Sequence, residues 1–272
     1  MSPKKKYLIT ITELIRINPI SVFFLGFIPP LLGAVLAIAV GLIFHNEKIS
    51  NYNWQCGRAK LPSLSRIINL PVERTFWQLF LLFHMPIRVI QLVAGFCRLG
   101  RTQHINCNRP LLYKVSRFLY LSVGLLELIF LSGLSVIGER ESISAHVWLF
   151  YVFGTCSLIH MVTNTFCHGH SAFYMNPYGR LSYHLKILFT VLSILSTPIL
   201  IISFLLYWRK CITWAYDVFA LCEYIGVFLN ICFHGCVFFD IRYKMIFSIR
   251  LVRNPVIKES DKISEKLEMR KY

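Results

Sequence analysis

Six apolar runs, each long enough to cross a lipid bilayer, constrain this chain more than any other feature of its sequence. A transmembrane helix needs about 20 mainly apolar residues. Lipid tails offer the backbone no hydrogen bonds, so a spanning segment must be a helix or part of a closed barrel. The runs predict helices over residues 20–44, 76–97, 118–137, 145–167, 185–208 and 217–240. We therefore expect an all-α, polytopic membrane protein with six transmembrane helices.

The composition agrees with a chain that has little mass outside the bilayer. Of the 272 residues, 56% are hydrophobic and 15% are charged, whereas about 25% charged residues is usual in soluble domains. The net charge of +16 is compatible with nucleic-acid binding, but the basic residues lie between and beyond the apolar runs, where membrane orientation explains them. The nine cysteines show no metal-ligand spacing. We expect neither a nucleic-acid partner nor a bound metal.

Lysine and arginine also predict how the chain crosses the membrane. Six spans place both termini on one side, and that side carries most of the basic residues. Because basic segments stay in the cytosol, we expect both termini there. The predicted parts are a cytosolic N-terminus over 1–19, a six-helix domain over 20–240, and a basic, largely disordered cytosolic tail over 241–272. Residues 45–75 then form a loop on the lumenal or extracellular side.

Two cysteines fall together on that opposite side. Cys56 lies in the loop over 45–75, and Cys211 lies between the fifth and sixth runs. Disulfides persist in the lumen and outside the cell. We predict that the two cysteines pair; the alternative is that they are two unrelated thiols.

The last run carries Glu223, Asn230 and His234 inside an apolar sequence. They are seven and four residues apart, so they fall along one face of a helix. Ionisable groups inside a membrane are costly and usually face a protein interior or a watery cavity, which makes them functional candidates. The alternative is that they only pair with a neighbouring helix and fix its packing.

Other runs carry polar residues that are possible partners for this face. His84 and Arg88 share one face of the second run, Glu127 lies near the middle of the third, and His146 opens the fourth. Arg88 and Glu127 lie at similar expected depths. They are therefore candidates for a buried ion pair that has no chemical role.

Three further histidines are interpreted as having no role in chemistry. His160 on the fourth run is expected to be structural. His168 and His170 are close enough to suggest a metal site, but no acidic or cysteine partner stands at ligand spacing. We expect these two histidines to lie in a solvated loop.

Several stretches, taken in order, resemble one known family. They are Cys56 followed by LPSLS at 61–65, FHMPIR at 83–88, NCNRPL at 106–111, Glu127, His146, SLIHM at 157–161, Cys211 followed by DVFALCEY at 217–224, and NICFHGCVFFD at 230–240. The chain resembles the post-GPI attachment to proteins factor 2 family, within the broader family that includes the damage-regulated autophagy modulators. The resemblance rests on the order and spacing of these stretches and covers nearly the whole chain.

The resemblance implies a multi-pass protein of the Golgi membrane, with the endoplasmic reticulum membrane as a second location. It implies a requirement in fatty-acid remodelling of GPI anchors, at the step that adds a saturated chain to the lyso-GPI intermediate. It leaves open whether the chain is the acyltransferase or an accessory factor of one. Implied partners are the lipid bilayer, GPI or lyso-GPI lipid, GPI-anchored proteins and other remodelling enzymes. No bound cofactor is implied, and acyl-CoA or a phospholipid is the candidate acyl donor.

Acyl transfer to a lipid hydroxyl needs a base, a donor for the developing oxyanion and room for apolar chains. His84 and His234 are the candidate catalytic bases, because imidazole titrates near neutral pH. The candidate lipid-binding or orienting residues are Arg88, Glu127, His146, Glu223, Asn230 and Asp240. The competing hypothesis is a non-enzymatic membrane scaffold or sorting factor for GPI-anchored proteins, because the chain carries no recognisable acyltransferase motif.

Overall fold

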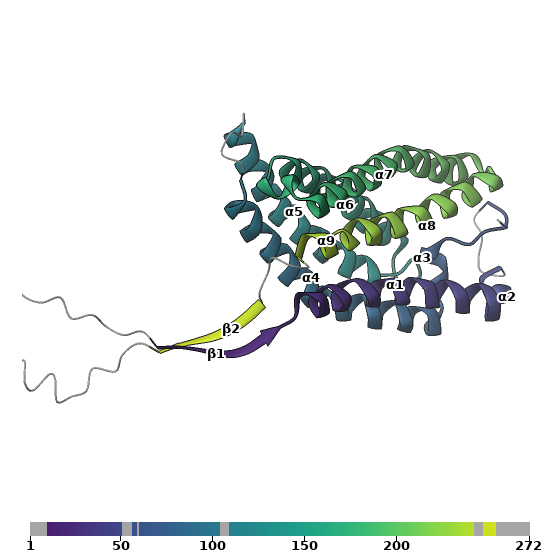
Figure 1. Ribbon diagram of the computed structural model, residues 1–272. Helices are drawn as coiled ribbons and strands as arrows, with labels where there is room; N and C mark the ends of the chain where they lie inside the picture. The colour runs from purple at the N-terminus through teal and green to yellow at the C-terminus, as the bar shows by residue number, and fades with distance from the viewer. Residues whose placement is uncertain (1–9, 51–55, 59, 104–108, 242–246, 254–272) are drawn as a thin grey trace, which may run out of the picture. The chain divides into compact units, whose positions relative to one another are not determined.

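The computed structural model describes residues 10–50, 56–58, 60–103, 109–241 and 247–253. The chain divides into two compact units, which are treated separately: a helical unit, Ile20–Lys244, and a small unit formed by Met1–Pro19 and Met245–Tyr272. The elements in Figure 1 are β1 (Thr10–Ile17), α1 (Pro19–Phe44), α2 (Asn46–Ser50), α3 (Leu64–Ile67), α4 (Pro71–Arg101), α5 (Pro110–Val136), α6 (Ile143–Gly169), the 3-10 helix η1 (Ala172–Met175), α7 (Pro177–Lys210), α8 (Thr213–Gly235), α9 (Val237–Ile241) and β2 (Phe247–Arg253).

The helical unit contains the six transmembrane helices that the sequence predicts. Within the described residues, six helical segments are long and apolar enough to cross a membrane: α1, α4, α5, α6, α7, and α8 continued by α9. The prediction of an all-α, multi-pass membrane domain is confirmed.

Several of these helices begin earlier than the apolar runs. α4, α5 and α7 start at Pro71, Pro110 and Pro177. Proline is favoured at the first helical position, because the N–H that it lacks would be unpaired there and its φ angle is already helical. The sequence between the fourth and fifth predicted runs, 168–184, is mostly helical and is divided among the end of α6, η1 and the first turns of α7.

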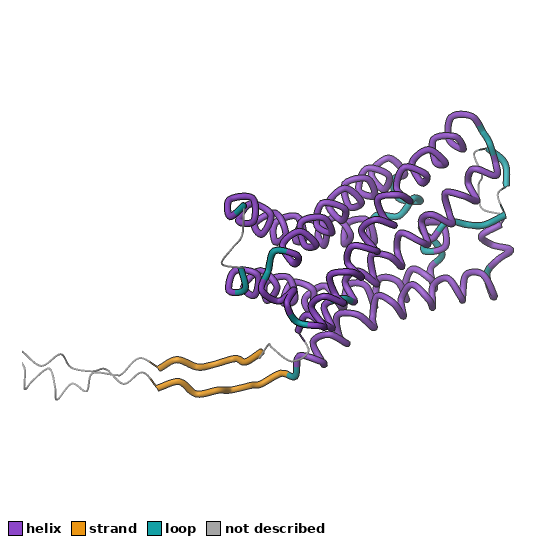
Figure 2. Tube along the Cα trace, turned by 45° about the horizontal axis from the view of Figure 1, so that its top comes forward, coloured by secondary structure: helices purple, strands orange, loops and turns teal. Residues whose placement is uncertain are grey.

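The spans alternate in direction, so neighbours in the chain run antiparallel. α5 packs beside α6, α7 beside α8, and α4 against α5, and Figure 2 shows the long helices running alongside one another. We call the end of the bundle that carries Cys56 and Cys211 the disulfide end. The opposite end, where α8 continues into α9, is the tail end.

A glycine allows close packing at the centre of the bundle. A Cβ at Gly124 on α5 would lie 2.7 Å from Nδ1 of His160 on α6 and 2.8 Å from a methyl carbon of Leu92 on α4. His160 is buried, donates from Nδ1 to the Tyr120 carbonyl oxygen at 3.0 Å and stacks on the Tyr120 ring. Because lipid provides little force that drives helices together, small residues that permit close contact matter here. His160 therefore contributes to packing, as the sequence indicated.

The predicted disulfide is present at the disulfide end. Cys56 and Cys211 are bonded, and their Cα atoms are 4.8 Å apart. The segment after Cys56 is also tied to α8, because Oδ1 of Asp217 accepts hydrogen bonds from the backbone N–H groups of Lys60 at 2.8 Å and Leu61 at 2.7 Å. The first loop is thus attached to the beginning of the last span by a covalent bond and by hydrogen bonds.

A second polar contact closes the short connector between α5 and α6. Arg74, in the first turn of α4, donates to the Glu141 carboxylate at 2.5 Å and to the carbonyl oxygen of Val136 at 2.6 Å. The hydrogen bond from Arg74 holds the pKa of Glu141 below its ordinary value. The start of α4 is therefore attached to the end of α5 and to the turn that follows it.

The described part of the small unit contains a two-stranded antiparallel ribbon. β1 pairs with β2 from Thr10 opposite Arg253 to Ile17 opposite Phe247, with an irregularity between Glu13 and Ile15. β1 is rich in β-branched residues, and β2 carries Phe247, Ile249 and Val252; aromatic and β-branched residues are enriched in strands. The tail over 241–272 was expected to be largely disordered, but among its described residues Ile241 ends α9 and 247–253 form a strand. Residues 1–9, 242–246 and 254–272 lie outside the described residues.

The disulfide generates a first prediction. In Cys56→Ser, we expect Cys211 to react with a membrane-impermeant maleimide without added reductant, whereas the wild-type pair should react only after reduction. Removal of the bond should also lower the stability of the fold, by about 2–4 kcal/mol for a typical disulfide, measured as the apparent melting temperature in detergent.

Cys222→Ser is the matched control, because Cys222 is a buried free thiol on α8. It should leave the labelling of Cys56 and Cys211 unchanged. Equal labelling of the wild-type pair with and without reductant would contradict the bond.

Candidate functional site

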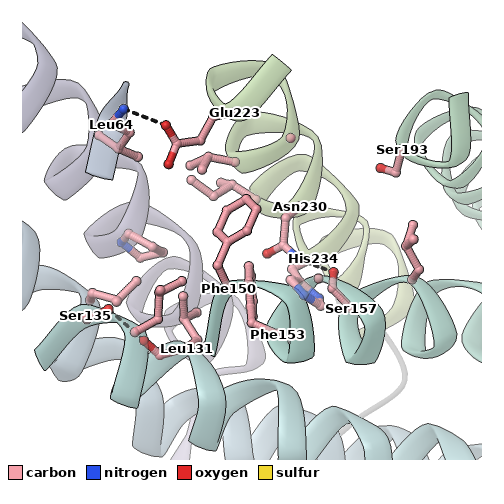
Figure 3. A pocket seen from close by; sticks show the side chains of 18 of the residues that line it. Leu64, Leu131, Ser135, Phe150, Phe153, Ser157, Ser193, Glu223, Asn230 and His234 are labelled. Atoms are coloured by element: carbon pink, nitrogen blue, oxygen red, sulfur yellow. Dashed lines mark hydrogen bonds between the residues drawn. The ribbon is translucent and has the colours of Figure 1, made fainter. Parts of the chain in front are cut away.

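A cavity of about 210 Å³ lies among the transmembrane helices. Most of its lining is apolar, as is usual for sites that bind apolar ligands. The imidazole, guanidinium, carboxylate and amide side chains in the lining are those of His84, Arg88, Gln91, His146, Glu223, Asn230 and His234. Figure 3 shows that Glu223 lies toward one end of the cavity, whereas Asn230 and His234 lie together farther along α8. The sequence-predicted face of the last span therefore faces this cavity.

His234 lies between two buried groups of opposite charge. Nδ1 of His234 is 2.7 Å from Nη2 of Arg88, and Nε2 is 3.2 Å from Oε1 of Glu127. A guanidinium can only donate, so Nδ1 accepts and the ring proton is on Nε2, which donates to the carboxylate. The direct pair between Arg88 and Glu127 considered from the sequence is corrected: the imidazole bridges them.

Two amide side chains extend this network. Nδ2 of Asn230 donates to Oε1 of Glu127 at 2.8 Å and to Oγ of Ser157 at 2.7 Å. Gln91 accepts from Nη1 of Arg88 at 2.9 Å and donates to the carbonyl oxygen of Val22 at 3.0 Å. Side chains of α4, α5, α6 and α8 and the backbone of α1 are thereby linked.

One ring nitrogen of His84 has no hydrogen-bond partner among the described residues, whereas both ring nitrogens of His234 have one. Nδ1 of His84 is hydrogen-bonded to the carbonyl oxygen of Leu81 on its own helix. A carbonyl can only accept, so Nδ1 carries the proton and Nε2 has a free lone pair. Within the described part of the chain, the Leu81 carbonyl is the one hydrogen-bond partner of this ring, and His84 lines the cavity one turn before Arg88. Of the two candidate bases, His84 is the one whose nitrogen is available.

Glu223 holds the segment that contains α3 at the disulfide end. Its carboxylate accepts from the backbone N–H of Leu64 at 2.8 Å, from the backbone N–H of Ser65 at 3.3 Å and from Oγ of Ser65 at 2.6 Å. These are the first residues of α3, whose backbone N–H groups have no partners within the helix. Glu223 therefore fixes the loop over the cavity, and its carboxylate is occupied by that task.

His146 closes the same end from α6. Its Nδ1 donates to the carbonyl oxygen of Ile137 at 2.7 Å, and the ring is buried. Among the described residues, Nε2 has no hydrogen-bond partner. His146 lines the cavity, so the structure places it with the candidate residues.

Asp240 belongs to a second buried cluster at the tail end, separate from the cavity lining. Its carboxylate is 2.9 Å from Nη2 of Arg98 and 2.6 Å from Nζ of Lys186, and it accepts from Oγ of Ser182 at 2.8 Å. Every carboxylate oxygen is engaged inside the protein. Asp240 thus does not join the other candidate lipid-binding residues.

His168 is part of the same cluster, which corrects the expectation of a solvated loop. It is fully buried near the end of α6. Nε2 donates to the carbonyl oxygen of Gly179 at 2.9 Å, so Nδ1 accepts from Nζ of Lys186 at 3.1 Å. His170, two residues later, is exposed. No group of three or more His, Cys, Asp or Glu residues in the described ranges is placed to hold a metal ion.

Sequence reasoning missed Lys186 and Arg98 as members of a site. Arg98 directly follows the second predicted run, 76–97, and Lys186 stands at the edge of the fifth, 185–208. A signal was present, because Lys186 is an ionisable residue at the border of an apolar run, and such residues usually have a partner inside the protein. The partner, Asp240, lies 54 residues away in the chain.

Comparisons with known proteins agree on one family. The model of the family described as "Frag1/DRAM/Sfk1/Cwh43P N-terminal domain" matches residues 19–244, a range that includes every long helix and neither strand. A Caenorhabditis elegans protein named "Post-GPI attachment to proteins factor 2" is 26% identical over 219 residues, which cover 78% of this chain and 81% of the relative. The Caenorhabditis briggsae protein of the same name is 26% identical over 236 residues, with 83% and 86% coverage. A Drosophila melanogaster protein named "Post-GPI attachment to proteins factor 2-like" is 27% identical over 184 residues, with 66% and 56% coverage. No solved structure matches the chain.

The Asp240 cluster predicts a ranking of two substitutions. Asp240→Asn leaves Arg98 and Lys186 buried without a counter-charge, and breaking a buried pair in this way costs about 3–5 kcal/mol. Lys186→Met leaves one cation with one anion, so we expect a clearly smaller fall in apparent melting temperature. A loss for Lys186→Met as large as that for Asp240→Asn would show that the charge balance is not what stabilises the cluster.

Glu223 generates a prediction for the loop. Glu223→Ala removes the acceptor for two buried backbone N–H groups, at a cost of about 1–3 kcal/mol. We expect faster trypsin cleavage after Lys60 and Arg66 in the detergent-solubilised protein. Glu223→Gln keeps an acceptor oxygen and should show a smaller increase in cleavage. Equal cleavage of the wild type and Glu223→Ala would contradict the role assigned to the carboxylate.

Proposed function

The chain belongs to the Frag1/DRAM/Sfk1/Cwh43P N-terminal domain family, and from this premise we propose that it acts in GPI-anchor maturation, at the step that adds a saturated acyl chain to lyso-GPI. The names of its relatives support the pathway. The cavity supports the step, because a lipid with one chain missing needs an apolar space with a few polar groups that orient it.

One observation carries the proposal: a histidine with a free nitrogen stands one helical turn from an arginine in the same cavity. His84 and Arg88 are four residues apart on α4, so their side chains emerge on the same face. A lyso-glycerolipid carries its phosphate and its free hydroxyl at neighbouring positions of one glycerol unit. Arg88 is suited to the phosphate and Nε2 of His84 to the hydroxyl.

Arg88 keeps donors for such a ligand. A guanidinium has five N–H donors, and the hydrogen bonds to Gln91 and His234 use two of them. These contacts fix the orientation of the guanidinium, while Glu127 balances its charge through the imidazole. His234, Glu127 and Asn230 therefore act as positioning residues for Arg88.

The reaction balances with acyl-CoA as the donor. Nε2 of His84 takes the proton of the lyso-GPI hydroxyl as that oxygen attacks the thioester carbonyl carbon. The tetrahedral oxyanion collapses, the new ester forms, the C–S bond breaks and the thiolate takes the proton back from His84. With a phospholipid donor, the departing hydroxyl oxygen takes the proton instead.

A second candidate is an accessory factor that presents lyso-GPI to a separate acyltransferase, or a scaffold that sorts GPI-anchored proteins. The observation in its favour is the satisfaction of the polar groups: Glu127, Asn230 and His234 bond to one another and to Arg88 and Ser157, as residues with a packing role would. In this case the cavity binds the lipid, and His84 performs no proton transfer.

The proposed location is the Golgi membrane, with the endoplasmic reticulum membrane as the second compartment. The bond between Cys56 and Cys211 is compatible with an oxidising lumen, so we place the disulfide end there and both termini in the cytosol. GPI-anchored proteins and other remodelling enzymes are the proposed partners.

Reconstitution tests the reaction. Purified protein in liposomes is supplied with lyso-GPI and a saturated acyl-CoA, or with lyso-GPI in phospholipid liposomes alone, and the diacylated product is measured. We expect His84→Ala to lower the rate at least about 100-fold, the usual lower limit for loss of a general base. Arg88→Lys should mainly raise the apparent KM for lyso-GPI, because a lysine cannot hold a phosphate in a bidentate way.

His184→Ala is the matched control, because His184 is an exposed histidine on α7 outside the cavity. It should transfer acyl groups at the wild-type rate. Transfer that is unchanged in His84→Ala would exclude His84 as the base, and binding of lyso-GPI without transfer by the wild type would favour the accessory factor.

A further inference from the structure

Two glycines on transmembrane helices face open space. The chain has 14 glycines. At twelve of them an added Cβ would come within 3.4 Å of another atom, but at Gly154 on α6 and Gly226 on α8 it would meet nothing within 4 Å. Both line the cavity. Glycine in a membrane helix usually permits close contact with a neighbouring helix, so glycines beside empty space require another explanation.

A buried hydroxyl on the third helix around this space has no partner. Oγ of Ser193 on α7 has no hydrogen bond to any described residue, and Ser193 is only 7% exposed. Its neighbours Ser196 and Thr197 instead donate to the Ser193 carbonyl oxygen, at 3.2 Å and 2.7 Å. Figure 3 shows Ser193 on a separate helix, facing the labelled residues of α6 and α8. The Ser193 hydroxyl is thus placed to donate to a group inside the cavity.

This part of the cavity reaches the lipid-facing surface between α6 and α7. Thr155, next to Gly154, lines the cavity and is exposed, and Ser196 and Thr197 of α7 also line it and are half-buried. Gly154 follows the start of α6 by 11 residues and Gly226 follows the start of α8 by 13, which is about 17 and 20 Å along each helix. In a hydrocarbon core about 30 Å thick, that depth is near the middle. Acyl chains are the molecules present there.

We propose that this part of the cavity binds the acyl chain of a membrane lipid, which enters between α6 and α7. The chain fills the space beside Gly154 and Gly226, and its ester carbonyl oxygen accepts a hydrogen bond from Ser193. The cavity of about 210 Å³ exceeds the roughly 150 Å³ of an engineered apolar cavity that stays dry and binds benzene. The inference rests on the proposed function, because it assigns the acyl chain a place in the same cavity as His84 and Arg88.

Photolabelling of the full chain in lipid nanodiscs tests the proposal. The probe is a lysophosphatidylcholine whose saturated chain carries a diazirine near its terminal methyl group. We expect the label on cavity-lining residues of α6, α7 and α8. Gly154→Leu and Gly226→Leu should each reduce this labelling at least about 5-fold, because leucine fills the space.

Matched variants at the same positions serve as controls. Gly154→Ala and Gly226→Ala should keep wild-type labelling, because a Cβ has room at both sites. Ser193→Ala should weaken probe binding about 2- to 10-fold, the effect of one hydrogen bond. Val162→Leu changes an exposed residue of α6 outside the cavity and should have no effect.

Two further measurements keep the test decisive. Retention of the disulfide and a single gel-filtration peak identify variants that fold. If the leucine variants do not, competition on the wild type decides: an unlabelled long-chain lysophosphatidylcholine should displace the probe, and a short-chain one should not. Label spread evenly over lipid-facing residues such as Ile159 and Ile202, or equal displacement by both lipids, would overturn the inference.

Acyl transfer measured on the same samples separates this inference from the proposed function. Specific labelling of the cavity without transfer overturns the proposed reaction alone. Transfer that proceeds at the wild-type rate in folded Gly154→Leu and Gly226→Leu overturns the acyl-chain site alone.

Discussion

The bridge that His234 makes between Arg88 and Glu127 is the interaction on which the interior of the bundle depends. A lone charge in the hydrocarbon region is strongly unfavourable, and here one cation, one anion and one neutral imidazole satisfy each other across α4, α8 and α5. Asn230 and Gln91 then connect the bridge to α6 and α1. Because each contact is directional, the rotation of these helices about their axes is fixed together with the charges. The polar side of the cavity is consequently preorganised.

The two buried polar clusters differ in what they leave unsatisfied. Around Asp240, two cations and a hydroxyl engage both carboxylate oxygens, and a neutral histidine accepts from one of the cations. Nε of Arg98 has no partner among the described residues, but no atom of the carboxylate faces the cavity. Beside the cavity, Nε2 of His84 and Oγ of Ser193 have no partner in the described chain. A carboxylate whose two oxygens are both engaged serves the fold, since adding a ligand to it would break existing bonds. Open groups in a cavity can gain bonds when a ligand arrives, and this is why the proposals centre on His84, Arg88 and Ser193.

Much of the architecture could be predicted from the sequence, because it follows from properties that belong to single segments. Length and hydropathy predict six spans, and a spacing of seven and four residues predicts that Glu223, Asn230 and His234 share a face. The disulfide follows because an even number of spans, α4 to α7, separates Cys56 from Cys211 and so puts both cysteines on the same side of the membrane. Helix starts were less accurate, because proline extends α4, α5 and α7 into polar sequence.

Partners across helices could not be predicted, because they depend on helix rotation and tilt, which no periodicity encodes. Arg88 and Glu127 were candidates for a direct pair, yet an imidazole lies between them. The pairing of β1 with β2 joins opposite ends of the chain and has no local signal.

The attachment of the first loop to α8 also limits which parts of the chain can be exchanged separately. Cys211, Asp217 and Glu223, which lie within one segment, bond to a stretch more than 150 residues earlier. A chimera between relatives that replaces the first loop must therefore also replace the start of α8. Otherwise the bonding groups of the two segments come from different proteins and do not match.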